Sequence, residues 1–166
     1  MAFTLSFSSL FQPKLNAHPS YFMTRIDFYI IPQNQPEQVS LFACKLIEKI
    51  YRSGHKIMVK VDDKDTAEAL DKQLWEYKPE SFIPHKILDN SSEASPDTSI
   101  LISYDSLGND YEVLVNLSSE VPLEFTRFER VTQIASQYEP QRLSSREHYK
   151  FYKDRGYPLH NHDLRK

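Results

Sequence analysis

Apolar and polar positions follow two different periods along the first part of the chain. Residues 25–31 are dense in branched and aromatic side chains and stop at Pro32, which predicts a strand. Residues 36–54 instead repeat apolar positions at helical spacing, begin with a proline and stop at Gly54, which predicts a helix. Residues 56–61 predict a second strand, so these elements form a βαβ unit.

The next segment continues this alternation of helices and strands. A helix is predicted over 65–78, where Asp65 and Glu68 resemble a capping box. A strand is predicted at 83–88, and a polar, turn-rich surface loop at 89–97 follows it. Strands that alternate with helices are typical of a largely parallel sheet that has helices on its faces.

The C-terminal part predicts two more strands and two more helices. Residues 99–104 and 112–117 predict strands that the turn-forming sequence SLGND joins as an antiparallel hairpin. A helix opened by Pro122 and ended by Pro140 follows, and a last helix covers about 141–155. The predicted fold class is therefore α/β, with a mixed, mainly parallel sheet flanked by helices.

Length and composition indicate one globular domain. The chain has 166 residues, of which 40% are hydrophobic and 26% are charged, and no apolar run approaches the roughly 20 residues of a membrane span. We interpret 1–22 as a dispensable leader that is either flexible or upstream of a native start at Met23. We interpret 23–159 as a single α/β domain and 160–166 as a C-terminal tail. The lone Cys44 cannot form an internal disulfide, so we expect a cytoplasmic protein without membrane contact.

Motifs for nucleotide and metal binding are missing from the sequence. The three glycines, Gly54, Gly108 and Gly156, are too far apart for a phosphate-binding loop, so we expect no cofactor. The HNHD run at 160–163 lacks a further placed ligand, so we expect no metal site.

Residues that resemble catalytic groups have structural interpretations. The acids at 62–65 adjoin a predicted helix start, where carboxylates cap the unpaired N–H groups. His85 lies at a strand entry, where a hydrogen-bonded structural histidine is the more common finding. A hydrolase on an α/β scaffold is a rival interpretation, but it needs a polar pocket that the sequence does not reveal. We therefore predict that the protein is not an enzyme.

Trp75, the only tryptophan, lies off the apolar stripe of its predicted helix. That stripe consists of Ala67, Leu70, Leu74 and Tyr77. At roughly 100° per residue, Trp75 lies about 120° from the centre of the stripe. A covered indole buries on the order of 150 to 250 Å², so we expect another surface to cover it. That surface is either the chain's own loop at Phe82 or a partner protein.

Positive charge is concentrated at the C-terminal end of the chain. The whole chain has a net charge of -3, yet residues 142–166 contain seven Lys or Arg against three Asp or Glu. Four cations lie along one side of the last predicted helix: Arg142, Arg146, Lys150 and Lys153. This side is a solvated basic face, a groove for an acidic peptide, or a site for single-stranded nucleic acid with Tyr149 and Tyr152 as stacking platforms.

Three sequence blocks carry a family resemblance. They are LDKQLW at 70–75, SFIPH at 81–85 and REHYKFY at 146–152. Together with Phe28-Tyr29 and Ala43-Cys44 they resemble the bacterial DNA polymerase III chi subunit family, over about 23–159. The resemblance implies a non-catalytic accessory subunit of the clamp-loader assembly in DNA replication. It also implies a fold similar to nucleotide-binding domains but without a phosphate loop.

The resemblance implies a first binding surface around Trp75. In the family this surface binds the psi subunit, which tethers chi to the clamp loader. The matching residues in this chain are Trp75 and Phe82, with Pro84 beside them. In some bacteria the same surface is expected to bind a DNA-repair helicase, so psi and the helicase are alternative partners.

The resemblance also implies a second surface that binds the C-terminal tail of single-stranded DNA-binding protein. That tail is acidic and ends in a phenylalanine with a free carboxylate. The matching residues are Arg142, Arg146, Tyr149 and Lys150. Arg142 replaces a lysine of well-known relatives, and Ala135 stands where a larger valine can wall the phenylalanine pocket. Contact with single-stranded DNA is then expected to be indirect.

Overall fold

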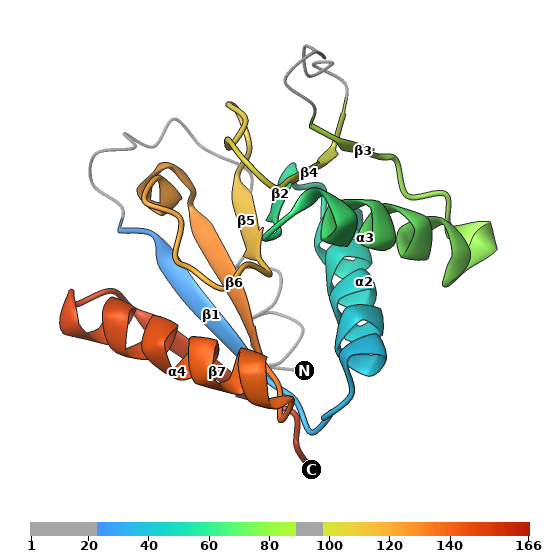
Figure 1. Ribbon diagram of the computed structural model, residues 1–166. Coiled ribbons are helices and arrows are strands. Elements are labelled where there is room, and N and C mark those ends of the chain that lie inside the picture. The colour runs from blue at the N-terminus through green and yellow to red at the C-terminus, as the bar shows by residue number, and fades with distance from the viewer. Residues whose placement is uncertain (1–22, 89–97) are drawn as a thin grey trace, which may run out of the picture.

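One seven-stranded parallel sheet organises the computed structural model, which describes residues 23–88 and 98–166. The strand order is β3-β4-β2-β5-β6-β1-β7 (Figure 1). The strands are β1 (Arg25–Ile30), β2 (Ile57–Lys60), β3 (His85–Ile87), β4 (Ile100–Ser103), β5 (Val113–Asn116), β6 (Arg130–Ala135) and β7 (Leu159–Asp163). The helices are α2 (Pro36–Arg52), α3 (Lys64–Glu76) and α4 (Glu139–Asp154), with short 3₁₀ turns η2 (Pro79–Ser81) and η3 (Phe125–Arg127).

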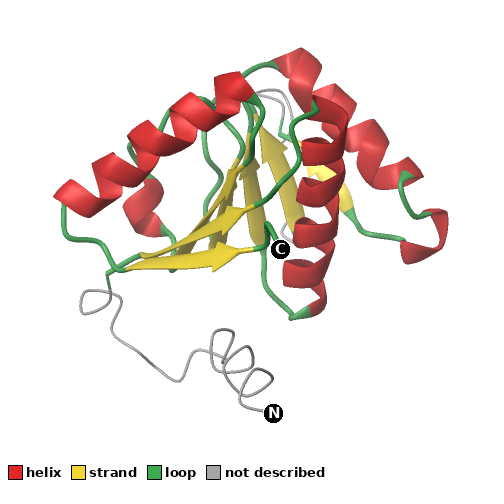
Figure 2. Ribbon diagram, turned by 90° about the horizontal axis from the view of Figure 1, so that it is seen from below, coloured by secondary structure: helices red, strands yellow, loops and turns green. Residues whose placement is uncertain are grey.

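Helices cover both faces of the sheet and create two cores. Helices α2 and α3 lie on one face, and α4 lies on the other (Figure 2). Along β2, Ile57 and Val59 pack under α2 and α3, whereas Met58 packs in the core under α4. Because both faces are buried, the central strands β2, β4 and β5 are nearly continuous apolar runs, as is usual for parallel sheets. The α/β class predicted from the sequence is confirmed.

The predicted antiparallel hairpin is wrong. Strands β4 and β5 lie on opposite sides of β2 and both run parallel to it, with Ile57 opposite Ile100 and Val113. The SLGND segment instead crosses from β4 to β5 over the face of the sheet that α4 covers, where Leu107 packs against the core. A Cβ at Gly108 would lie 2.9 Å from Cε of Met58 and 3.1 Å from Cδ2 of Leu101, so a larger residue here would force these core side chains to shift. Turn-forming residues therefore mark the loop correctly but do not fix the direction of the next strand.

The helix predicted from Pro122 is also wrong. This segment contains the short turn η3 and then strand β6, in which Arg130 to Ile134 are all buried. The apolar positions recur every three or four residues, which mimics a helix. A strand buried on both faces shows no alternation that would contradict this period. Pro140 consequently opens α4 within its first turn and does not end a preceding helix.

Two element ends differ from the sequence expectations. Asp63 is the N-cap of α3 and accepts hydrogen bonds from the Thr66 backbone N and side chain, so the cap lies two residues before the predicted Asp65 box. The residues 160–163, expected in a C-terminal tail, belong to β7 and pair with β1. The leader 1–22 and the loop 89–97 lie outside the described residues.

The buried carboxylate of Asp27 connects the three strands β6, β1 and β7. Its side chain is inaccessible to solvent and accepts a hydrogen bond of 2.6 Å from Nε of Arg130 on β6. Nε2 of His162 on β7 lies 2.7 Å from its Oδ1, and Nε of Arg25 lies 3.1 Å from its Oδ2. Burial alone would raise the pKa of Asp27, but these hydrogen bonds and the arginine charges lower it far below its usual range.

The lowered pKa makes Asp27 a source of stability at neutral pH. Above the pKa of an aspartate in an unfolded chain, about 4, the ionised group stabilises the folded state. This contribution is lost as the pH falls through the folded-state pKa. The paired carboxylate therefore holds β7 against β1 under ordinary conditions.

We predict that Asp27→Asn lowers the free energy of unfolding by about 3 to 5 kcal/mol, because it removes the buried negative charge that Arg130 and His162 contact. Urea denaturation measures the change. The control is Asp163→Asn, which removes a carboxylate from an exposed ion pair and should lower the free energy of unfolding much less. Equal effects of the two substitutions would contradict the structural role of Asp27.

Candidate functional site

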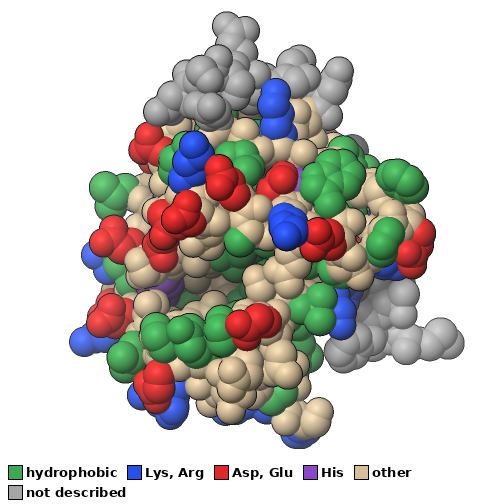
Figure 3. Space-filling view, turned by 45° about the vertical axis from the view of Figure 1, so that its right-hand side comes forward, with side chains coloured by type: hydrophobic (Ala, Val, Ile, Leu, Met, Phe, Trp, Pro, Cys, Tyr) green, Lys and Arg blue, Asp and Glu red, His purple; other side chains and the backbone are tan. Residues whose placement is uncertain are grey.

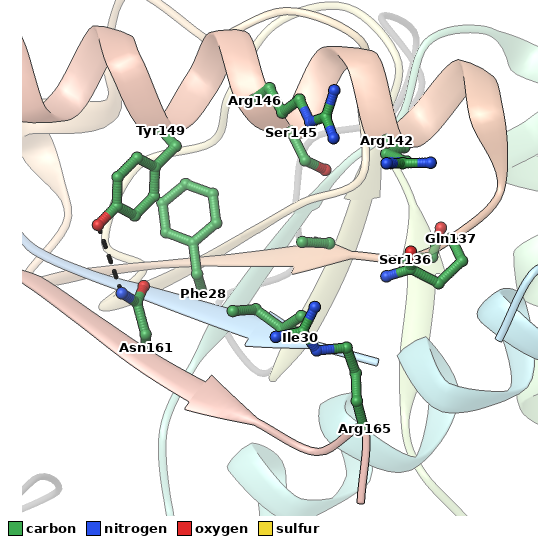
Figure 4. Close-up of a pocket in the computed structure, with 11 residues that line it drawn as sticks. Phe28, Ile30, Ser136, Gln137, Arg142, Ser145, Arg146, Tyr149, Asn161 and Arg165 are labelled. Carbon is green, nitrogen blue, oxygen red and sulfur yellow. Dashed lines mark hydrogen bonds between the residues drawn. The ribbon is translucent and has the colours of Figure 1, made fainter. Parts of the chain in front are cut away.

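A cavity of about 390 Å³ lies between α4 and the carboxyl ends of β1 and β6. Four parts of the chain line it, and the side chains point into it from both sides (Figure 4). The lining residues are Phe28, Ile30, Ala135, Ser136, Gln137, Arg142, Ser145, Arg146, Tyr149, Asn161 and Arg165. We call this cavity the α4 cleft.

Aromatic and aliphatic side chains form the floor of the α4 cleft. The rings of Phe28 and Tyr149 meet edge to face with their centroids 5.2 Å apart. Nδ2 of Asn161 donates a hydrogen bond of 3.4 Å to the Tyr149 hydroxyl, which connects β7 to α4 across the cleft. Ile30 and Ala135 complete the apolar surface at the ends of their strands. The floor is suited to a nonpolar side chain.

Arginines form the rim of the α4 cleft. Arg146 is exposed and makes no hydrogen bond or ion pair with any residue in the described part of the chain. One turn earlier, Nη1 of Arg142 lies 3.3 Å from the exposed carboxylate of Glu139. Guanidinium groups bind carboxylates with two parallel hydrogen bonds. The cleft therefore combines an apolar floor with a rim that attracts anions.

The structure brings together most of the residues predicted for the second surface. Arg142, Arg146, Tyr149 and Ala135 all line the α4 cleft. Lys150 is exposed on the same helix but does not line the cleft. Phe28 and Ile30 of β1, and Asn161 and Arg165 near the C-terminus, also line the cleft but were not predicted as site residues. The only sequence feature that pointed to them was the concentration of Lys and Arg at the C-terminal end, which includes Arg165.

Tyr152 does not provide the stacking platform considered for single-stranded nucleic acid. Its ring is fully buried in the core under α4, and its hydroxyl accepts a hydrogen bond of 3.1 Å from Gln133 Nε2. A base cannot reach this ring without unfolding of the core. The interpretation of Tyr152 as a stacking platform is therefore wrong. The ring of Tyr149 is half-buried and meets the ring of Phe28 edge to face.

Trp75 and Phe82 form a second exposed surface at the end of α3. Trp75 is 52% exposed and Phe82 is 78% exposed, so the interpretation that the Phe82 loop covers the indole is wrong. Pro84 is also exposed, and we call these three residues the Trp75 surface. Figure 3 shows hydrophobic side chains gathered on this side of the molecule, over α3 and η2.

His85 supports the inner face of the indole. Its ring centroid lies 4.5 Å from that of Trp75, and its side chain has no solvent exposure. The two ring nitrogens lie 2.7 and 3.1 Å from the carbonyl oxygens of Ile83 and Asp71. These contacts confirm a hydrogen-bonded structural role for His85. The indole is thus held from behind while its other face is open to solvent.

A larger cavity of about 490 Å³ lies at the carboxyl ends of β2 and β5. Doubly wound α/β folds bind nucleotides at such strand ends. Here the lining contains Asp62 and several hydroxyl groups but no lysine or arginine to pair with a phosphate. The oxygen Oδ1 of Asp62 accepts hydrogen bonds from the Ser119 backbone N and side chain. The carboxylate thus joins two loops of the fold.

Residues 23–88 and 98–166 contain neither a cluster of metal ligands nor a membrane-spanning helix. Within these ranges no three His, Cys, Asp or Glu side chains gather as a ligand set. The HNHD run at 160–163 lies in β7, where successive side chains point to opposite faces of the sheet. No helix in the same ranges is long and apolar enough to cross a membrane.

Comparisons with known proteins agree on one family. Residues 23–160 match the family model for the DNA polymerase III chi subunit, HolC. A DNA polymerase III subunit chi of Pseudomonas aeruginosa is 34% identical over 142 residues, which cover 86% of this chain and 98% of that protein. The subunits chi of Haemophilus influenzae and Escherichia coli are 30% and 23% identical, over 80% and 82% of this chain and 92% and 96% of their own lengths. The chain therefore belongs to the DNA polymerase III chi subunit family.

Proposed function

We propose that this chi subunit is a non-catalytic adaptor of the clamp-loader assembly. Its α4 cleft binds the C-terminal tail of single-stranded DNA-binding protein, and its Trp75 surface binds the psi subunit. The observation that carries the proposal is the arginine rim around an apolar floor in the α4 cleft. The protein then links the polymerase to coated DNA without contacting the DNA directly.

The chemistry of the α4 cleft supports an acidic peptide that ends in phenylalanine. A volume of about 390 Å³ lies within the range of roughly 300 to 1,000 Å³ that is typical of ligand sites. A phenyl ring of the ligand can meet the aromatic edges of Phe28 and Tyr149. The terminal carboxylate of the same residue can pair with Arg146, which has no competing partner among the described residues.

The backbone of Phe82 supports the assignment of the Trp75 surface to a protein partner. Phe82 has φ 42° and ψ 63°, a left-handed conformation that costs a non-glycine residue roughly 1 to 2 kcal/mol. Its ring is nevertheless mostly exposed, so no burial within the chain offsets this cost. Local strain of this kind is found at binding sites, where a partner benefits from the geometry. Exposed tryptophan and phenylalanine are suitable anchors for such an interface.

The α4 cleft and the Trp75 surface lie near opposite edges of the sheet. The α4 cleft involves β1 and β7 at one edge, whereas the Trp75 surface lies beside β3 at the other edge. Both partners can therefore bind at once. A chi subunit held on the assembly by psi would raise the effective concentration of the cleft near the many tails on coated DNA. A modest affinity for each tail is then sufficient for recruitment.

We predict that Arg146→Ala weakens binding of an acidic, phenylalanine-terminated tail peptide by about 1 to 3 kcal/mol, because a charge-assisted contact is lost. Isothermal titration calorimetry measures the affinity. Lys153→Ala is the matched control, since Lys153 is an exposed cation of α4 that does not line the cleft. If Arg146→Ala left the affinity unchanged, the α4 cleft would not be the tail site.

Trp75→Ala should abolish copurification with psi while leaving the affinity for the tail peptide unchanged, because the indole is exposed and far along the sheet from the α4 cleft. Pull-down with tagged chi and calorimetry provide the two measurements. Recovery of a helicase in place of psi would contradict the psi assignment. A stability loss of about 2 to 5 kcal/mol, as for a core cavity, with psi binding preserved would contradict a partner role for Trp75.

Phe82→Gly should be more stable than Phe82→Ala by about 1 kcal/mol, because glycine adopts a positive φ without the strain of a Cβ atom. Both variants remove the ring, so the comparison isolates the backbone. Urea denaturation of the two variants tests this. Equal stabilities would show that Phe82 is not strained, and the argument from strain to a binding role would fail.

A further inference from the structure

Arg165 reaches the α4 cleft from the segment that follows β7. The backbone N of Leu164 donates a hydrogen bond of 2.8 Å to the carbonyl oxygen of Ile30, so this segment continues to follow β1 beyond the last strand residue. From there the side chain of Arg165 points toward the cavity, on the side opposite α4 (Figure 4). The cleft therefore has a cationic side chain on each of its two walls.

The carboxylate of Asp163 holds the Arg165 side chain in this position. Its Oδ1 accepts hydrogen bonds from the backbone N and from Nε of Arg165, at 3.1 and 2.9 Å. Its Oδ2 accepts one from Nη2 at 2.6 Å. Nη1 makes no hydrogen bond to any residue that the structure describes. The guanidinium is thus oriented in advance and retains donors for a second acceptor.

We infer that Arg165 is a specificity-determining residue that binds an acidic side chain of the peptide, upstream of its terminal phenylalanine. This inference rests on the proposed function of the α4 cleft. Arg146 and Arg165 lie on opposite walls of the cleft (Figure 4), and the peptide has a single terminal carboxylate. If it pairs with Arg146 on α4, the opposite wall at Arg165 faces the residues that precede the terminus. A planar guanidinium there selects aspartate over a neutral side chain.

Two synthetic peptides and two chi variants test this role by calorimetry. One peptide has aspartates ahead of a C-terminal phenylalanine, and the other has asparagines in their place with the same free terminus. Arg165→Gln should weaken binding of the acidic peptide about three- to tenfold and that of the neutral peptide less than about twofold. Lys166→Gln removes the same charge one residue further on, outside the cleft lining, and should change neither affinity by more than about twofold.

Each outcome separates the inference from the proposal on which it rests. Equal weakening of both peptides by Arg165→Gln would overturn the specificity role, because Arg165 would then contact a group that the two peptides share. Equal effects of Arg165→Gln and Lys166→Gln would overturn it as well, since only net charge would matter. If the acidic peptide bound and required Arg146 but not Arg165, the inference alone would fail. If the native chain bound neither peptide, the proposed function itself would fail.

Discussion

The burial of Asp27 is the constraint on which the edge of the sheet and the α4 cleft depend. A carboxylate without solvent exposure is stable only when charged and hydrogen-bonding groups surround it, and these come from β6, β7 and β1 itself. This requirement fixes β7 beside β1, in the register that places Asn161 next to Phe28. The cleft floor and its second cationic wall follow from that register. A buried ion pair in one core thus positions a binding surface on the opposite face of the sheet.

The arrangement of the two exposed surfaces explains how a chain without a phosphate loop can serve a polymerase assembly. The parallel sheet separates the two surfaces, with the arginine-rimmed α4 cleft near one edge and exposed aromatic side chains near the other. Cationic side chains attract acidic partners and bring specificity, while an exposed indole supplies apolar contact area. Related architectures bind nucleotides at such strand ends, but here the cavity at the ends of β2 and β5 has no lysine or arginine in its lining. In the proposed function, recognition takes place instead at α4 and at the end of α3.

The sequence predicted the α/β class and the local elements of the first half because hydrophobic periods report local structure, and its three motif blocks indicated the family. The prediction was wrong where one sequence pattern is compatible with several structures. Arg130 to Ala135 form a strand buried on both faces, which a helical period imitates, and the SLGND turn did not reveal that β4 and β5 flank β2. The helical half of the cleft was visible as spacing along α4. Its other half was not, because Phe28 and Arg165 are brought together only by the register of β1 and β7.

The most direct test of the account is a titration of isotope-labelled protein with the acidic, phenylalanine-terminated peptide, followed by two-dimensional ¹H–¹⁵N NMR spectra. Because Trp75 is the only tryptophan, its indole N–H gives one signal that reports on the other surface. The account predicts shifted signals for Ile30, Arg146, Tyr149 and Asn161, and an unchanged indole signal. Shifts at the indole without shifts around α4 and β7 would contradict it.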